Sequence, residues 1–266
     1  MPVIRIPYFH VDAFTRRPFA GNPAGVCLLE GAWPPDELLQ KIAAEHNLSE
    51  TAFVLPREHD FALRWFTPKV EVDLCGHATL AAAFVLFRYL GYVGTTIPFT
   101  TVSGPLAVER QGGMLVLDFP SRPLQPCTTP EALVRGLGRR PVEVLRSRDY
   151  CAVFATPEEI TGLAPDMVQL GQLEDCLGII ATAPGREVDF VSRFFAPRTG
   201  VAEDPVTGSA HCSLVPYWSQ RLGKRRLIAH QLSARGGELF CEDCGERVKI
   251  GGYAVAYLRG EIEINL

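Results

Sequence analysis

Two polar segments of the chain carry residues that can hold an anion or move a proton, and each stands immediately before an apolar, helix-compatible run. The residues concerned are Asp73, Cys75, Gly76 and His77 in the first segment, and Glu203, Asp204, Thr207, Gly208 and Ser209 in the second. A helix N-terminus presents unpaired N–H groups and a partial positive charge, and glycine lets a ligand approach that backbone. Each segment therefore predicts a pocket for a carboxylate or a developing oxyanion. The alternative is that both glycines only allow tight turns, with Asp73, Thr207 or Ser209 as helix caps.

A third polar segment ends in Glu50, at the entry to the apolar strand predicted at 52–55. Partial burial would raise the pKa of this carboxyl group and suit it to proton transfer near neutral pH. Ser49 beside it, and Asn22 in a turn-rich loop that leads into another strand, are further candidates for substrate binding. Each residue also has a structural interpretation, for example Glu50 as an exposed loop residue and His77 as a hydrogen-bonded histidine at a helix end.

An internal repeat positions the two helix starts. The segment Arg64–Pro68 resembles Arg193–Pro197, and each is followed by a polar loop, the glycine, and an apolar run that ends in Leu-Gly at 90–91 or 222–223. The spacing within the two copies differs by three residues. Because there are only two copies at wide spacing, the pattern indicates paired domains related by a pseudo-two-fold axis and not a solenoid.

Short β-rich segments surround the two helices. Strands are predicted at 3–9, 53–55, 61–66, 115–119, 238–241, 247–250, 253–258 and 262–266, with a helix beginning at 36 and short helices near 130–136 and 157–171. The helix from 36 places Leu38, Leu39, Ile42 and Ala43 on one face. We predict an α+β fold with two pseudo-symmetric halves, each a curved, mostly antiparallel sheet around a central helix. The first half takes 1–120, completed by a strand from about 255–266, and the second takes 121–254, with the active site in the cleft between them.

Composition excludes several classes of protein. The 266 residues include 26 Lys and Arg against 30 Asp and Glu, so neither a nucleic-acid surface nor an acidic tail is indicated. Arg5, His10 and Asp12 interrupt the first twenty residues, so we expect no signal peptide there, and the longest uncharged apolar stretch, 74–87, is too short to span a bilayer. We expect a cytoplasmic protein that acts on a small molecule, without nucleic-acid or membrane partners.

The eight cysteines are scattered along the chain, and several stand in apolar runs, which is typical of reduced, buried thiols. Cys241 and Cys244 form a lone CxxC in a hairpin-like stretch. A zinc site needs about four ligands, and no second CxxC or paired histidine follows. No metal site is therefore predicted.

Taken in order, these motifs resemble a known family. They are Phe19–Val26 (FAGNPAGV), Asn47–Val54 (NLSETAFV), Arg64–Pro68 (RWFTP), Leu74–Leu80 (LCGHATL), Glu203–His211 (EDPVTGSAH) and the GGYAV and RGEI segments near the end. Their order and coverage resemble the phenazine-biosynthesis PhzF-like isomerases. The resemblance implies the diaminopimelate-epimerase-like fold, which agrees with the repeat.

The resemblance also implies a role for each matched residue. Glu50 corresponds to the general acid/base that moves a proton between substrate carbons, while His77, Asp204 and Ser209 correspond to groups that hold substrate and assist the relay. The founding activity of the family isomerises a dihydro-hydroxyanthranilate without metal or organic cofactor. Gly76 and Gly208 correspond to backbone positions that receive a carboxylate. A small carboxylate-bearing substrate, no cofactor and a possible homodimer are what the resemblance implies.

Three alternatives stay open. A two-thiol amino-acid racemase would use Cys75, but the position before Gly208 is Thr207, whose hydroxyl is a very weak acid, and Cys212 lies one helical turn further on. A Ser–His–Asp hydrolase built from Ser209, His77 and Asp204 lacks the G-x-S-x-G elbow, because residues 206–210 read VTGSA. A non-catalytic small-molecule-binding module would not need the residues suited to proton transfer, so their presence favours an enzyme.

Overall fold

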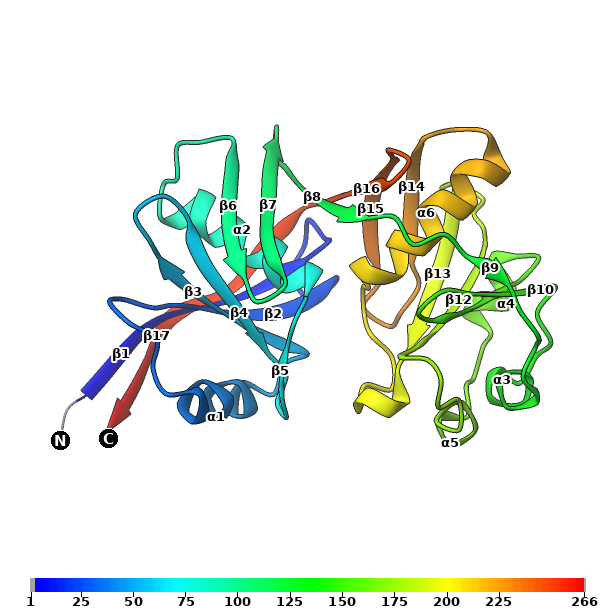
Figure 1. The fold of residues 1–266 in the computed structure, drawn as a ribbon, viewed down its shortest axis with the longest axis horizontal. Coiled ribbons are helices and arrows are strands. Elements are labelled where there is room, and N and C mark those ends of the chain that lie inside the picture. Colours follow the sequence, from blue (N-terminus) through cyan, green and yellow to red (C-terminus); the bar gives the residue numbers. More distant parts are fainter. Residues whose placement is uncertain (1–2, 266) are drawn as a thin grey trace. The chain divides into compact units, whose positions relative to one another are not determined.

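The structure, a computed structural model, describes residues 3–265 and divides the chain into two compact units (Figure 1). Unit 1 takes the chain up to Asp118 and again from Gly251, and unit 2 takes Phe119–Ile250. The chain passes between the units twice, within strands β8 (Met114–Pro120) and β16 (Arg247–Gly252). Over the described residues, no helix has the length and apolar character needed to cross a membrane.

Unit 1 is a sheet of mostly antiparallel strands. Besides β8, they are β1 (Val3–Ala13), β2 (Asn22–Leu28), β3 (Glu50–Pro56), β4 (Phe61–Phe66), β5 (Glu71–Val72), β6 (Thr96–Thr101), β7 (Gly104–Gln111) and β17 (Ala254–Asn265). Strand β17, red in Figure 1, runs antiparallel beside the blue β1 along its full length. The two parallel pairs are β2 with β3 and β4 with β6. The C-terminal segment thus supplies a strand to the sheet that the N-terminal segment begins.

Two helices pack on this sheet. Helix α2 (Gly76–Tyr89) is buried on nearly every side, as its almost uniformly apolar sequence requires. Helix α1 (Asp36–His46) follows two prolines and carries two acidic residues in its first turn, which complement the helix dipole. It buries Leu39, Ile42 and Ala43, so the predicted apolar face is confirmed, although Leu38 is only partly buried.

Unit 2 repeats this arrangement. Its elements are β9 (Gln125–Pro126), α3 (Glu131–Leu137), β10 (Glu143–Arg146), β11 (Tyr150–Val153), α4 (Pro157–Thr161), α5 (Met167–Leu170), β12 (Ile179–Pro184), β13 (Phe190–Phe195), a 3-10 turn (Pro197–Thr199), α6 (Gly208–Leu222), β14 (Arg226–Gln231), β15 (Gly237–Asp243) and most of β16. The parallel pairs are β11 with β12 and β13 with β14, in the same places as in unit 1. Helix α6 is the counterpart of α2.

Helix α6 contains Pro216, which has no N–H to donate to the carbonyl of Cys212 four residues earlier. The backbone N–H of Arg122 donates to that carbonyl instead, at 2.9 Å. The buried helix therefore keeps this carbonyl satisfied, and the segment after β8 is tied to its side.

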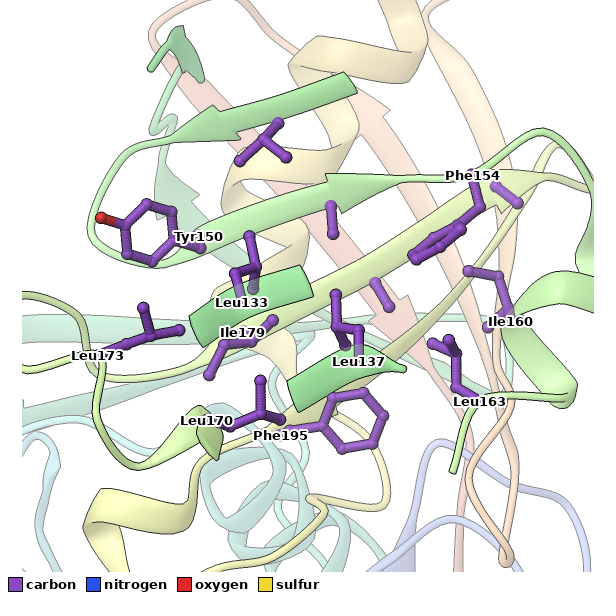
Figure 2. Packing of buried hydrophobic residues seen from close by; sticks show 14 of the residues in the cluster. Leu133, Leu137, Tyr150, Phe154, Ile160, Leu163, Leu170, Leu173, Ile179 and Phe195 are labelled. Carbon is purple, nitrogen blue, oxygen red and sulfur yellow. The ribbon is translucent and has the colours of Figure 1, made fainter. Parts of the chain in front are cut away.

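The core of unit 2 lies between its strands and its short helices, and Figure 2 shows these side chains converging. The labelled residues Leu133 and Leu137 of α3 meet Ile179 of β12 and Phe195 of β13, with Leu170 of α5 beside them. All five side chains are at most 1% exposed. Burial of each apolar side chain stabilises the fold by about 1.5–3 kcal/mol, so this cluster holds the β11–β12 pair rigidly in place.

The repeat seen in the sequence corresponds to a repeated ion pair. Arg64 on β4 binds both carboxylate oxygens of Glu71 at 2.7 Å, and Arg193 on β13 binds both oxygens of Glu203 at 2.7 and 2.9 Å. The partners are separated by seven residues in unit 1 and by ten in unit 2. The three-residue difference between the copies is thus accommodated in the loop that each arginine spans. The α+β architecture of two similar halves is confirmed.

Some predicted elements have different limits. The segments predicted as strands at 253–258 and 262–266 form the single strand β17, because Gly260 pairs in register with Tyr8 and does not end the strand. The helix expected over 157–171 is two short helices. Pro165 disfavours helical backbone at the residue before it, and Asp166 then caps α5 by accepting from the N–H groups of Val168 and Gln169.

Candidate active site

In unit 1, the parallel pairing of β2 with β3 and the start of α2 bring the predicted residues together. Glu50 is the first residue of β3, Asn22 is the first of β2, and His77 is the second of α2. The Nε2 atom of His77 lies 3.3 Å from Glu50 Oε2. On the other side of the ring, Nδ1 lies 3.2 Å from the amide nitrogen of Asn22 and 3.5 Å from the sulfur of Cys75.

The imidazole of His77 is neutral in this setting, because burial lowers its pKa to about 3. The amide nitrogen of Asn22 can only donate, so Nδ1 accepts and the ring proton sits on Nε2, toward Glu50. The Nε2 atom is buried, and although Glu50 is near, the two are not aligned for a hydrogen bond. His77 therefore offers a neutral N–H donor beside a carboxylate.

The start of α2 is suited to an anion. The residue before the helix is Cys75, in extended conformation, and its side chain caps no N–H group. Cys75 and not Asp73 thus takes the N-cap position, and Gly76 begins the helix. Since no side chain of the cap residue satisfies the first-turn N–H groups, they can stabilise negative charge on a ligand next to Glu50, whose side chain is 20% exposed.

The start of α6 has the same form. Thr207 is the N-cap residue, again without a side-chain cap, and Gly208 begins the helix. The hydroxyl of Thr207 donates to Asp204 Oδ2 at 2.5 Å. Gln231, at the end of β14, donates to the carbonyl of Asp204 at 2.7 Å and accepts from the N–H of Thr207 at 2.8 Å. Gln231, which sequence analysis did not select, thus holds the loop that carries Asp204.

Ser209, the second residue of α6, has a partner that sequence analysis also missed. Its Oγ accepts a hydrogen bond from Arg148 Nη2 at 3.0 Å, and the same nitrogen lies 3.5 Å from Asp149 Oδ2. These two charged residues immediately precede the buried strand β11, as Glu50 begins the buried strand β3. A charge at the entry to an apolar strand is the signal that could have identified them.

Ser49, the remaining predicted binding residue, is half-buried in the bend before β3. His211 is fully buried, and its Nδ1 donates to the carbonyl of Thr207 at 2.8 Å. Burial lowers the pKa of His211 to about 4, so it is neutral and structural. In unit 2, the Ser209 hydroxyl accepts a hydrogen bond from Arg148, and the Asp204 carboxylate accepts one from Thr207.

A two-thiol mechanism needs a cysteine before the first glycine of each helix, and only α2 has one there. Cys75 lies at the start of α2, but Thr207 takes the equivalent place in α6, as the sequence indicates. Cys212, one turn into α6, is buried, and burial raises its pKa to about 11. A thiol with that pKa is almost entirely protonated at neutral pH and is a poor base.

Three ligand atoms of Glu50, Cys75 and His77 lie within 4.8 Å of one another. Carboxylate, thiolate and imidazole are a set that Zn²⁺ accepts. The sequence did not indicate this grouping, because Glu50 is far from the other two residues in the chain and β3 must pack beside α2 to bring them together.

Comparison with known proteins gives a single answer. The family model described as phenazine biosynthesis-like protein matches residues 11–260. An uncharacterized isomerase of Pseudomonas aeruginosa is 52% identical, covering 98% of this chain and all of the relative. A human phenazine biosynthesis-like domain-containing protein is 41% identical over 97% of this chain and 99% of its own.

The crystal structure of a phenazine biosynthesis protein of the PhzF family from Enterococcus faecalis superimposes with a TM-score of 0.95, at 46% identity, over 97% of this chain and 99% of that one. This likeness confirms both the fold and the family that the motifs predicted. With the family match across nearly the whole chain and a close relative named as an isomerase, the protein belongs to the phenazine biosynthesis-like PhzF family and is an isomerase.

Proposed function

We propose that the protein moves a proton between carbons of a small carboxylated substrate, with Glu50 as the general acid/base and without metal or organic cofactor. The observation that carries this proposal is the position of Glu50, 3.3 Å from a neutral histidine at the uncapped start of α2. The site joins a proton acceptor to donors that stabilise negative charge.

The reaction needs two proton transfers. The Glu50 carboxylate takes a proton from one carbon, so a C–H bond breaks, an O–H bond forms, and the electron pair spreads into the conjugated system of the substrate. The Glu50 carboxylic acid then gives the proton to a second carbon and returns to the carboxylate. The N–H groups at the start of α2 and the Nε2–H of His77 stabilise the anion between the two steps.

A neutral His77 suits a reaction in which Glu50 transfers the proton and His77 only donates a hydrogen bond. With a pKa of about 3 it does not hold a second proton at neutral pH. Its contribution is a fixed hydrogen-bond donor, and Asn22 at Nδ1 keeps the tautomer that points this donor toward the reacting groups. Glu50 is then the only group of this cluster that exchanges protons near pH 7 in the proposed reaction.

The proposal assigns substrate holding to Asp204, Ser209 and Gly208 of unit 2 and to Ser49 of unit 1. Support comes from the rigid mounting of these groups. Gln231 and Thr207 hold the Asp204 loop, Arg148 orients the Ser209 hydroxyl, and Gly208 begins an uncapped helix. Pre-organised donors lower a barrier more than mobile ones, since no reorganisation is needed during the reaction.

A racemase that uses Cys75 is the second candidate, favoured by the 3.5 Å contact of its sulfur with His77. The test is incorporation of deuterium from D2O. The wild type, Glu50→Gln and Cys75→Ala are incubated with dihydro-hydroxyanthranilate and a panel of amino and hydroxy acids, and products are followed by NMR and mass spectrometry.

Exchange or isomerisation that requires Glu50 and survives Cys75→Ala supports the proposal. Exchange that requires Cys75 and survives Glu50→Gln overturns it in favour of the racemase. Binding of a panel compound to the wild type with no exchange at all would instead favour the non-catalytic binding module.

A further inference from the structure

Asp149 in unit 2 has no role in the reaction as described so far, and the inference drawn from the polar cluster around it rests on the proposed function. Asp149, Arg148 and Ser209 form the cluster, which we term the Asp149 cluster. Arg148 Nη2 lies 3.0 Å from Ser209 Oγ and 3.5 Å from Asp149 Oδ2. Asp149 is 2% exposed, whereas the side chain of Arg148 is 35% exposed and Ser209 is half-buried. The Asp149 carboxylate is therefore shielded from solvent, and the Arg148 guanidinium and the Ser209 hydroxyl lie nearer the surface.

The repeat places this cluster at the counterpart of the Glu50 site. Phe53 pairs with Arg64 in unit 1, and Ala181 pairs with Arg193 in unit 2. Three residues before Phe53 is Glu50, so its counterpart, three residues before Ala181, is Gly178. The helix residues correspond in the same way, His77 in α2 to Ser209 in α6.

The carboxylate of unit 2 reaches this position from the neighbouring strand. Tyr150 pairs with Ile179 in the parallel register, which sets Asp149 beside Gly178. A Cβ on Gly178 would lie 2.2 Å from the ring of Phe194, so a side chain at 178 itself would force that ring to move.

The hydrogen bonds decide what Ser209 can offer. Arginine donates and cannot accept, so Ser209 Oγ is the acceptor in its bond with Arg148. Its hydroxyl proton then points elsewhere, and no acceptor for it is found in the part of the chain that the structure describes. The Nε atom of Arg148 is buried and likewise has no hydrogen-bond partner among residues 3–265. The hydroxyl proton of Ser209 at the start of α6 is thus left for a ligand, beside the partly exposed guanidinium of Arg148.

The charge of the surroundings favours an anion. Arg148 and Arg122 both act on Asp149, so two positive groups face one carboxylate. Burial raises the pKa of Asp149 and both arginines oppose that rise. The start of α6 adds a partial positive charge and its Thr207 provides no side-chain cap. A carboxylate is the ligand group that a planar guanidinium and a hydroxyl donor recognise together.

We propose that Arg148 and Ser209 bind the carboxylate of the substrate, and that Asp149 is the positioning residue that holds the Arg148 guanidinium for this purpose. Both halves of the repeat carry a carboxylate near this position, Glu50 in unit 1 and Asp149 in unit 2, and the proposal gives the two residues different roles.

The test measures binding, so that it does not depend on turnover. The probes are 3-hydroxyanthranilate and its carboxamide, titrated by calorimetry or NMR against the wild type, Arg148→Gln, Arg148→Lys and Asp149→Asn. Arg146→Gln is the matched control, because Arg146 lies two residues earlier with a side-chain exposure of 33% and an ion pair to Asp175.

We expect the wild type to prefer the carboxylate. Arg148→Gln should weaken carboxylate binding about tenfold or more, in line with one charge-assisted pair, and leave the carboxamide unaffected. Arg148→Lys should restore part of the loss, and Arg146→Gln should resemble the wild type. Asp149→Asn should weaken carboxylate binding several-fold, but cause no further loss when added to Arg148→Gln, which a merely structural role would not predict.

The proposal is overturned if Arg148→Gln binds the carboxylate as tightly as Arg146→Gln does, or if the wild type does not prefer the carboxylate to the carboxamide. A Glu50→Gln arm separates this inference from the proposed function. If Glu50→Gln keeps deuterium exchange while Arg148→Gln loses carboxylate binding, the acid/base role fails and the carboxylate subsite stands. If Glu50→Gln loses deuterium exchange while Arg148→Gln keeps carboxylate binding, the carboxylate subsite is ruled out and the acid/base role stands.

Discussion

Nε2 of His77 lies 3.3 Å from Oε2 of Glu50, and the imidazole between Asn22 and this carboxylate is neutral because it is buried. A protonated histidine would form an ion pair with Glu50 and hold it as a carboxylate. A neutral one leaves Glu50 able to accept a proton and return it. The relationship therefore fixes which member of the pair carries the proton in the reaction that we propose.

Glu50→Gln should lower the rate of deuterium exchange by about 10²–10⁴-fold, the usual contribution of a general acid/base. The substrate should still bind, because the amide has the size of the carboxylate. Exchange is measured by NMR in D2O, with Glu37→Gln, an exposed residue of α1, as the control. A loss of less than tenfold would contradict the acid/base role.

His77→Gln should keep a neutral donor and lose its exact placement, lowering kcat about 10–100-fold. Since the pKa of His77 is about 3, the wild-type rate should show no inflection from His77 between pH 5 and 8. The pH profiles of kcat for the two proteins are compared. An acid limb near pH 6.5 that vanishes in His77→Gln would show that the ring is protonated in this range.

Acid should destabilise the fold through His77 and His211, whose pKa values burial lowers to about 3 and about 4 from 6.5. Below pH 6.5 the unfolded chain binds protons at both residues and the folded chain does not, so the free energy of unfolding falls as the pH falls toward 4. Each histidine adds up to about 1.4 kcal/mol per pH unit.

Urea unfolding of the wild type and His77→Gln between pH 6.5 and 4.5 checks this expectation. The free energy of unfolding of the variant should depend less steeply on pH than that of the wild type, by the contribution of about one proton. Parallel curves for the two proteins over this range would show that His77 is not held neutral by the fold.

Zn²⁺ should inhibit the enzyme, because Glu50, Cys75 and His77 present ligand atoms within 4.8 Å. A metal bound there would occupy the carboxylate that accepts the proton. Exchange is measured with micromolar Zn²⁺, then with excess EDTA, in the wild type and Cys75→Ala. EDTA alone should leave the rate unchanged and should reverse the inhibition, and Cys75→Ala should resist Zn²⁺. Loss of activity on EDTA treatment alone would count against the metal-free mechanism.

Gly178→Ala should destabilise unit 2 by about 1–3 kcal/mol, because the new Cβ would lie 2.2 Å from the ring of buried Phe194. Gly113→Ala is the control, since its Cβ meets only Tyr253, at an ordinary 3.6 Å. The free energy of unfolding is measured in urea. Equal stabilities of the two variants would show that Phe194 moves aside at little cost.

Much of the fold could be predicted from the sequence, because its signals are local. The apolar run after Gly76 predicts a buried helix, and the paired Arg64 and Arg193 segments predict two similar halves. The strand at 61–66 follows from its β-rich composition, and the face of α1 follows from side-chain periodicity. The site residues Glu50, His77 and Ser209 stood out because charged or hydroxyl groups border apolar segments.

Pairing between distant segments decided the rest. Gly260 continues β17 because Tyr8 pairs with it, and Asp149 lies beside Gly178 because β11 lies parallel to β12. The grouping of Cys75 with Glu50 has the same origin. The tertiary structure also determines the protonation state of His77, which is neutral because surrounding side chains exclude water from it. Sequence determines which groups can react, and burial and register determine which of them meet and in what state.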